Sequence, residues 1–270
     1  MYGREDGAVV RSLLIPRVEH HTDRSMMSAP PRAAETPAEA AEEHFDVLDA
    51  SGAFTGERRA RSVVHRLGLY HRAVHVWVLA PRSGELLLQL RAACKDSWPS
   101  RWDVSSAGHV SAGEQSLPSA ARELAEELGL ALPPERFRLL FTHLEMLDSE
   151  QRGKPFLNHE FNDVYLVELS PEERALLDAD NAVLRDDASA GVGDAAPALA
   201  PALASAPSRP ANSRWELQRS EVAAVRWQPW HEVRELYASC HADIVPLSDT
   251  ASYFRLFDEC ARVCAAAAAR

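Results

Sequence analysis

Runs of apolar residues alternate with turn-forming residues along much of the chain, and they predict a mixed α/β fold. Residues 74–79 and 86–90 are rich in Val and Leu, and Arg82-Ser83-Gly84 between them is typical of a hairpin turn. The same reasoning predicts further strands at residues 46–49, 102–107, 136–147, 162–169 and 222–227. Helices are expected at residues 117–128, 171–177, 229–238 and 249–264.

The helix expected at residues 117–128 has the clearest sequence signals. Pro118 suits the first turn, where its missing N–H costs no hydrogen bond, and Gly129 suits the position just past the end. Ala120, Leu124 and Leu128 recur at helical spacing. They form an apolar stripe that can pack on a sheet.

Another side of this helix carries acidic residues. Glu123, Glu126 and Glu127 stand at i, i+3 and i+4, a spacing that brings their carboxylates to one face. Like charges at this spacing repel each other, so a cation is their natural partner, and oxygen ligands without thiolates favour Mg²⁺ or Mn²⁺. A solvated acidic face is the alternative interpretation, because most Glu-rich helices have one.

These glutamates belong to a longer spaced pattern. Gly108 is followed after five residues by Glu114 and after seven more by Arg122, from which the chain reads RELAEELGL. This is the complete pattern GX5EX7REUXEEXGU, in which U is a bulky aliphatic residue, and it resembles the Nudix hydrolases. The resemblance implies a Nudix-type α/β/α sandwich with a mixed β-sheet. It also implies hydrolysis of a diphosphate linkage in a nucleoside-diphosphate-X or another organic pyrophosphate.

The resemblance assigns roles to the polar residues of the motif. Glu123 and Glu127 are expected to be the principal ligands of Mg²⁺ or Mn²⁺, and Glu126 a third ligand or the base that activates water. Arg122 is expected to orient a carboxylate, a role that fixes ligand geometry. Glu114 is expected to bind the metal through water or to hold the loop.

Contacts with the substrate are expected from the motif and from the residues before it. Gly108 is expected to let the backbone approach the phosphates. The preceding stretch is similar to the branch of the family that contains the isopentenyl-diphosphate isomerases. Arg91 and Lys95 match positions of that branch and are expected to contact phosphate. His71 and His109 also match; their counterparts in the isomerases bind metal, whereas a hydrolase can use them for phosphate contacts.

One departure from this branch favours hydrolysis over isomerisation. The isomerases use a cysteine for proton transfer, and Ala107, which has no proton to give, stands at that position here. Glu160 is a candidate base or metal ligand, because the isomerases place acidic ligands in the corresponding segment. An isopentenyl-diphosphate isomerase remains the main alternative, and a Nudix module that binds without catalysis is the other.

Composition and charge narrow the range of partners. The chain has 270 residues and a formal net charge of -11, which argues against a general nucleic-acid or anionic-membrane surface. No apolar run approaches the roughly 18 residues of a membrane helix. Four cysteines without a CxxC pair indicate a reducing compartment. We therefore expect a cytoplasmic enzyme, monomeric or homodimeric, that acts on a small-molecule diphosphate.

Two segments of biased composition set the limits of the expected domain. Residues 1–43 lack helical or strand periodicity and are expected to be a disordered extension, whose arginines leave an organellar presequence open as an alternative. Residues 178–213 are largely Ala, Pro, Ser and Gly, and they are expected to be a disordered loop insertion. The hydrolase domain is thus expected to cover residues 44–265.

Overall fold

The computed structural model describes most of the chain between residues 42 and 269. The described ranges are residues 9–10, 42–95, 97–151, 154–177, 215–247 and 250–269. The predicted insertion at residues 178–213, and the predicted extension apart from residues 9–10 and 42–43, lie outside them.

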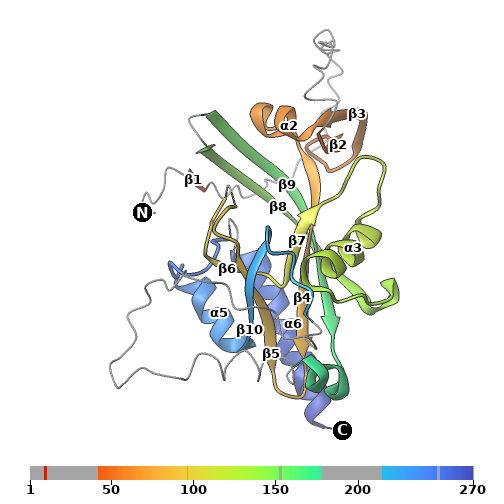
Figure 1. The fold of residues 1–270 in the computed structure, drawn as a ribbon, viewed down its shortest axis with the longest axis vertical. Helices are drawn as coiled ribbons and strands as arrows, with labels where there is room; N and C mark the ends of the chain where they lie inside the picture. Colours follow the sequence, from red (N-terminus) through yellow and green to blue (C-terminus); the bar gives the residue numbers. More distant parts are fainter. Residues whose placement is uncertain are drawn as a thin grey trace, which may run out of the picture.

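A mixed sheet forms the centre of the molecule (Figure 1). Its strands are β1 (Val9–Val10), β4 (His71–Ala80), β5 (Glu85–Arg91), β6 (Trp102–Asp103), β7 (Ser106–His109), β8 (Phe137–Gln151), β9 (Lys154–Glu168) and β10 (Val222–Pro229). The strand order is β1-β8-β9-β4-β5-β10, with β6 paired to β5 and β7 paired to β4. β4 and β9 run parallel, whereas β8 and β9 form an antiparallel hairpin.

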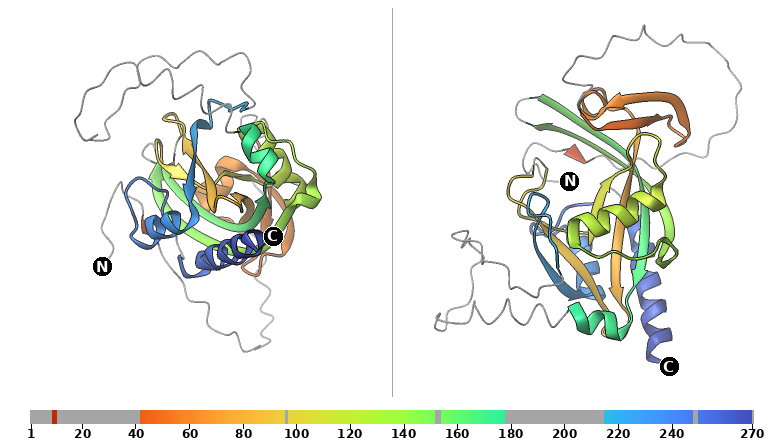
Figure 2. Two further views of the ribbon diagram at one scale, coloured as in Figure 1. Left: turned by 90° about the horizontal axis from the view of Figure 1, so that it is seen from below. Right: turned by 45° about the vertical axis from the view of Figure 1, so that its right-hand side comes forward.

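Helices cover both faces of this sheet (Figure 2). They are α3 (Ser116–Leu128) on one face, and α5 (Trp230–Ala238) and α6 (Thr250–Ala268) on the other. Successive side chains of a strand point to opposite faces. Trp77 and Leu79 of β4 therefore join the core beneath α5 and α6, while Val76 and Val78 join the core beneath α3. The predicted α/β/α sandwich with a mixed sheet is confirmed.

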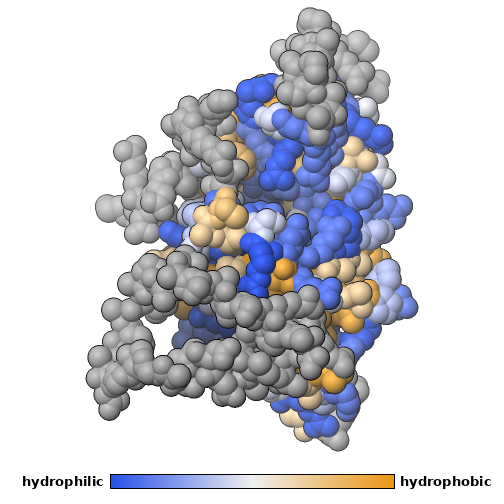
Figure 3. All heavy atoms as spheres, in the orientation of Figure 1, coloured by the Kyte–Doolittle hydropathy of each residue, from blue (hydrophilic) through white to orange (hydrophobic). Residues whose placement is uncertain are grey.

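A second, two-stranded sheet and a short helix precede the main sheet. They are β2 (His44–Leu48), β3 (Phe54–Ala60) and α2 (Arg61–Leu67). The pattern did not predict α2, because a helix of fewer than two turns with adjacent valines has little intrinsic helical stability. Gly68 ends it in the left-handed conformation, at φ 64°. On the face drawn in Figure 3, hydrophilic residues predominate over the described surface around this part.

The hairpin of β8 and β9 is longer than the sequence pattern predicts. Strands were expected at residues 136–147 and 162–169, but each observed strand has 15 residues. The extra length carries polar residues such as Asp148 and Asn158, which conceal the alternation of a strand. The extension brings β9 into contact with α2 and places Glu160 on a strand.

Two other predictions can be compared with the structure directly. The strand expected at residues 102–107 is two short strands, β6 and β7, which pair with different partners. The helix expected at residues 117–128 is α3, which begins one residue earlier and ends at Gly129 with φ 73°. A 3-10 turn, η1 (Pro134–Arg136), leads into β8.

Candidate active site

A cavity of about 620 Å³ is bounded by residues of α2, β7, α3, β8 and β9. Its walls carry eight carboxylate side chains, which are Glu43, Asp103, Glu123, Glu126, Glu127, Glu145, Glu160 and Glu221. They also carry four Lys or Arg side chains, which are Arg61, Arg91, Lys95 and Arg122. An anionic diphosphate would meet a negative wall here, because acidic groups outnumber basic ones. Bound cations would remove this obstacle.

Gly108 on β7 makes room for a carboxylate of α3. A Cβ atom at position 108 would lie 2.1 Å from Glu123 Cδ and no more than 2.5 Å from either carboxylate oxygen. The helix thus crosses β7 so closely that Glu123 occupies the space of a side chain. Burial raises the pKa of Glu123 above its ordinary value. The glycine of the motif is therefore required by the position of a predicted metal ligand.

The variant Gly108→Ala is expected to displace the Glu123 carboxylate and to lower activity by about 100-fold, the cost of misplacing a reacting group by about 1 Å. It should also destabilise the protein by about 1 to 3 kcal/mol through overpacking. Phosphate or mononucleotide release from a diphosphate substrate would measure the first effect, and urea unfolding the second. Gly84→Ala, at a hairpin turn with φ 70°, is the matched control, and it should lose stability without losing activity. Full activity in Gly108→Ala would contradict this role.

Arg122 holds several carboxylates of the motif together. Its Nη1 donates to Glu123 Oε1 at 2.8 Å and to Glu126 Oε2 at 3.2 Å. Its Nη2 donates to Glu114 Oε2 at 3.2 Å. Ser119 Oγ donates to the same Glu114 oxygen at 2.9 Å. Arg122 thus lies where an orienting residue is expected. Among the described residues that line the cavity Glu114 is not found, so its contacts favour holding the loop.

Glu127 is the most deeply buried glutamate of the motif, and 4% of its surface is exposed. Its Oε2 accepts hydrogen bonds from the Ala107 N–H at 3.2 Å and from Gln89 Nε2 at 3.5 Å. Burial, reinforced by the charge of Glu123, raises the pKa of Glu127 to about 8. A buried carboxylate without a cationic partner is costly, and a bound cation would favour its charged form.

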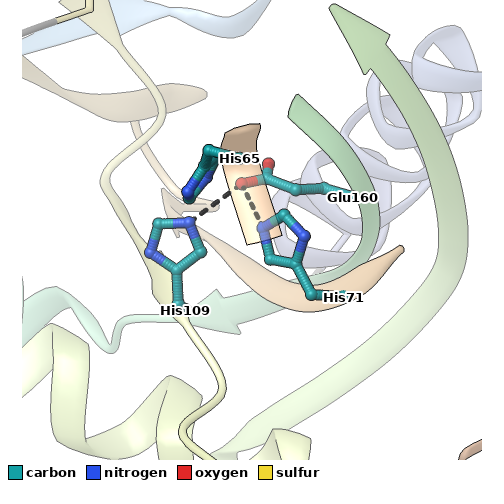
Figure 4. A group of neighbouring side chains, drawn as sticks. All are labelled: His65, His71, His109 and Glu160. Carbon is teal, nitrogen blue, oxygen red and sulfur yellow. Dashed lines mark hydrogen bonds and ion pairs between the residues drawn. The ribbon is translucent and has the colours of Figure 1, made fainter. Parts of the chain in front are cut away.

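Four further side chains converge beside these carboxylates (Figure 4). They are His65 from α2, His71 from β4, His109 from β7 and Glu160 from β9, and one ligand atom of each lies within 4.8 Å of the others. Glu160 Oε1 lies 3.0 Å from His109 Nε2 and 3.3 Å from His71 Nε2. Three imidazoles and a carboxylate suit transition metals such as Zn²⁺ or Mn²⁺. We call this group the histidine cluster.

Backbone carbonyls orient two of the histidines through Nδ1. His65 Nδ1 donates to the Arg61 carbonyl at 2.9 Å, and His71 Nδ1 donates to the Leu69 carbonyl at 3.1 Å. Nε2 of His71 then carries a lone pair, which is the usual arrangement of metal-bound histidine, whereas Nε2 of His65 lies 3.1 Å from Asn158 Oδ1, a contact that metal binding must replace. The buried His71 Nε2 makes no hydrogen bond of good geometry. These observations fit a metal ligand better than a packed polar side chain.

His109 differs from the other two histidines in its outer partner. Its Nδ1 accepts a hydrogen bond from Arg61 Nη1 at 3.3 Å, so in this structure its Nε2 carries the proton that Glu160 accepts. Metal binding through Nε2 requires the other tautomer. Burial lowers the pKa of His109 to about 3 and that of His65 to about 4. Both are therefore neutral at physiological pH, as metal ligation requires.

The buried glutamates make the stability of the metal-free protein dependent on pH. Burial raises the pKa of both Glu127 and Glu145 to about 8, from 4.5. The folded state thus binds more protons than the unfolded state between those values, and stability falls as pH rises through about 8. His65 and His109 have lowered pKa values, so their stabilising contribution is lost only as pH falls below 6.5. Between pH 6.5 and 8 the effect of the two glutamates on stability can therefore be measured apart from that of the two histidines.

Urea unfolding in EDTA should therefore show a loss of about 2 to 4 kcal/mol between pH 6.5 and pH 8, since one pKa unit corresponds to about 1.4 kcal/mol. The variants Glu127→Gln and Glu145→Gln should each remove about half of this loss. Glu135→Gln, an exposed position on η1, is the control and should change nothing. A wild-type protein equally stable at both pH values would show that these carboxyl groups ionise normally.

Arg91 and Lys95, the predicted phosphate contacts, line the cavity but have acidic partners. Arg91 Nη1 donates to Asp103 Oδ2 at 2.9 Å, and its Nε donates to the Ser97 carbonyl at 3.1 Å. Lys95 is paired with Glu221. Arg91 thus fastens the loop that follows β5. Phosphate binding by either residue remains a prediction, and it requires exchange of these partners.

His65 and Arg61 are among the residues that line this site and that sequence reasoning missed. Both lie on α2, outside the spaced pattern that begins at Gly108. The spacing of His65 and His71 was the available signal, but a pair of histidines is weak evidence for a metal site without knowledge of the fold. Ala107, whose position was matched to the isomerase cysteine, lines the cavity.

Comparisons with known proteins show which proteins this chain is similar to. Residues 69–190 match the model described as the NUDIX domain. Nudix hydrolase 3 of Arabidopsis thaliana is 42% identical over 218 residues, which are 81% of this chain and 23% of that protein. An uncharacterized Nudix hydrolase of Clostridium acetobutylicum is 34% identical over 128 residues, 46% of this chain and 59% of that protein. The isopentenyl-diphosphate Delta-isomerase of Serratia proteamaculans is 30% identical over 125 residues, 46% and 65% respectively.

The extent of these matches is limited. The chain spans from 23% to 65% of the length of these curated relatives. A solved structure from Deinococcus radiodurans aligns with a TM-score of 0.46 and 17% identity, over 81% of this chain and 99% of that chain.

His65 and Arg61 precede the residues that match the domain model. In the described part of the chain, we find no helix with the length and apolar character needed to span a bilayer.

Proposed function

We propose that this chain, which belongs to the Nudix family, hydrolyses a diphosphate linkage in a small organic pyrophosphate with the help of divalent cations. One observation supports this most strongly: Glu123, Glu126 and Glu127 line a single cavity with three members of the histidine cluster, which are His65, His109 and Glu160. Arg122 holds two of these carboxylates. The acidic excess of the cavity supports the requirement for cations, because the substrate is itself an anion.

Two groups of residues would hold metal. Glu123 and Glu127 offer hard oxygen ligands of the kind that Mg²⁺ and Mn²⁺ prefer. The histidine cluster offers nitrogen donors for a transition metal. Metal bound at these positions would neutralise the diphosphate oxygens and make a bound water more acidic. Glu160, considered from sequence as a base or a ligand, is the carboxylate of the histidine cluster. We assign His71 and His109 to metal binding rather than to phosphate contact, because their ring nitrogens lie close to this carboxylate.

Side chains of the protein accept the proton of the attacking water and hold the carboxylates in place. Glu126 is the candidate to accept the proton of the attacking water, because 53% of its side chain is exposed and it lines the cavity. The water oxygen then forms a bond to phosphorus as the bridging P–O bond breaks, and the bridging oxygen leaves on the second phosphate-bearing product. Arg122 keeps Glu123 and Glu126 in place during this step.

An isopentenyl-diphosphate isomerase is the alternative. The match to a bacterial isomerase favours it, but Ala107 opposes it. Among the described residues that line the cavity, Cys94 is the cysteine that could supply a thiol. Its Sγ donates a hydrogen bond to the Ser220 carbonyl at 3.4 Å. Isomerisation needs a group that delivers a proton to carbon, whereas hydrolysis does not.

A panel of diphosphates would test the proposed function. Nucleotide sugars, dinucleotides, nucleoside diphosphates and prenyl diphosphates would be incubated with Mg²⁺ or Mn²⁺, and phosphate or mononucleotide release would be followed. We expect release from one substrate class, abolished by EDTA. A parallel incubation of isopentenyl diphosphate in D2O would detect isomerisation. Deuterium entering the substrate without phosphate release would establish the isomerase, and no reaction in either arm would indicate a binding module.

A further inference from the structure

Phenyl rings lie against all three imidazoles of the histidine cluster. Phe45 of β2 is stacked on His71, with ring centroids 5.1 Å apart and an interplanar angle of 5°. It is also stacked on His109, at 4.6 Å and 21°. Phe156 of β9 is stacked on His65, at 4.5 Å and 9°. Phe45 has no exposed surface, so its ring is fixed by packing on all sides.

The backbone around Phe45 is joined to the loop that connects β7 to α3. The Ala112 N–H donates to the His44 carbonyl at 2.7 Å, and Phe45 forms an isolated bridge with Ser111. Asp46 Oδ2 accepts a hydrogen bond from the Gly113 N–H at 3.0 Å. β2 is therefore bonded to the loop that follows His109, and these bonds fix the position of Phe45 relative to that histidine.

His109 depends on this ring more than the other two histidines do. His65 and His71 are each held by a backbone carbonyl at Nδ1. The outer partner of His109 is Arg61 Nη1, a flexible side chain that must release Nδ1 before Nε2 can bind metal. Stacking on Phe45 uses neither ring nitrogen, so this contact with the imidazole face persists when Arg61 leaves and metal binds.

We propose that Phe45 is a positioning residue for metal binding, because its ring holds the imidazoles of His71 and His109 in the orientation in which both Nε2 atoms face Glu160. The proposal rests on the proposed function, since it concerns one of its metal sites. It goes beyond the domain match, because Phe45 precedes residues 69–190. The hairpin of β2 and β3 is thereby part of the site.

Co²⁺ titration of the full-length, EDTA-stripped protein would test this role, because visible absorption reports the ligand geometry directly. The absorption that disappears in His71→Ala defines binding at the histidine cluster. In Phe45→Leu we expect this binding to weaken about 10- to 100-fold, the usual effect of losing an outer-sphere partner, with an altered spectrum. Phe45→Tyr keeps the ring face and should remain within about threefold of the wild type.

Phe257→Leu is the matched control, since Phe257 of α6 is also fully buried but belongs to the core between α6 and the sheet. It should lose stability and keep the Co²⁺ affinity and spectrum. If Phe45→Leu does not fold, Phe45→Met fills the space without a flat face and should show the same weakening. Wild-type affinity and spectrum in Phe45→Leu or Phe45→Met would overturn the proposal.

The outcomes also separate this inference from the proposed function. Co²⁺ absorption requires no substrate, so a protein that hydrolyses none of the diphosphates can still show the effect of Phe45. A wild-type protein without His71-dependent Co²⁺ absorption would overturn the role of Phe45. Hydrolysis supported by the carboxylates of α3 would be unaffected by that result.

Discussion

The variant Glu127→Gln is expected to lose diphosphate hydrolysis by roughly 10²- to 10³-fold or more, the scale on which a single electrostatic contact to a developing charge acts. Gln keeps the shape of Glu127 and can still accept hydrogen bonds from Gln89 and Ala107, but it carries no charge for a cation. The same change should stabilise the metal-free protein at pH 8 by about 2 to 4 kcal/mol. The carboxyl group of Glu127 ionises more readily in the unfolded state, because its pKa in the folded state is about 8, and Gln removes this advantage of the unfolded state.

Loss of activity together with gain of stability distinguishes this prediction from simple damage to the fold. Steady-state phosphate release would measure the first effect, and urea unfolding in EDTA the second. Saturating Mg²⁺ should stabilise the wild type and have little effect on the variant, since ligands of the folded state raise its stability. Glu135→Gln serves again as the control. A variant with normal activity would remove Glu127 from the metal site.

Glu160→Gln is expected to lower the retention of transition metal by about 100-fold or more, with a fall in activity where that metal is needed. Its carboxylate oxygen lies within 3.3 Å of both His71 Nε2 and His109 Nε2. Burial by itself would raise the pKa of Glu160, but the adjacent imidazoles hold it well below its ordinary value. The group is therefore charged, as a metal ligand must be.

Metal content after dialysis, measured with the kinetics, separates a ligand from a base. A ligand role predicts that metal content and activity fall together in Glu160→Gln. A general base would instead lower kcat and leave metal content at the wild-type level, which would restore the sequence-based alternative for Glu160. His159→Ala is the matched control, because His159 neighbours Glu160 in sequence but is paired with Asp148 at 3.2 Å. It should retain metal and activity.

Local spacing was sufficient to predict the carboxylate part of the site. Glu123, Glu126 and Glu127 lie on one helix, where positions three and four residues apart must share a face. Pro118 and Gly129 marked the ends of that helix almost correctly. The runs of large apolar residues in β4 and β5 likewise predicted the central strands, because a strand buried on both faces has a nearly continuous apolar sequence.

The histidine cluster could not be predicted in the same way. Its four residues come from α2, β4, β7 and β9, and between His65 and Glu160 the chain forms most of the sheet. Their proximity depends on the parallel pairing of β4 with β9, in which His71 lies opposite Glu160. Register between distant strands follows from packing of the whole sheet, and a one-residue shift would turn Glu160 to the other face.

The sequence by itself determined the family resemblance, the acidic face of α3 and the absence of a cysteine at Ala107, because each depends on residue identity or on spacing within one element. Three contacts were decided by the tertiary structure alone. The Glu123 carboxylate occupies the space that a side chain at position 108 would need, Glu160 lies beside three imidazoles, and Phe45 stacks on two of these imidazoles. These contacts join segments distant in the chain, and their geometry arises only when the sheet, its helices and the β2 hairpin pack together.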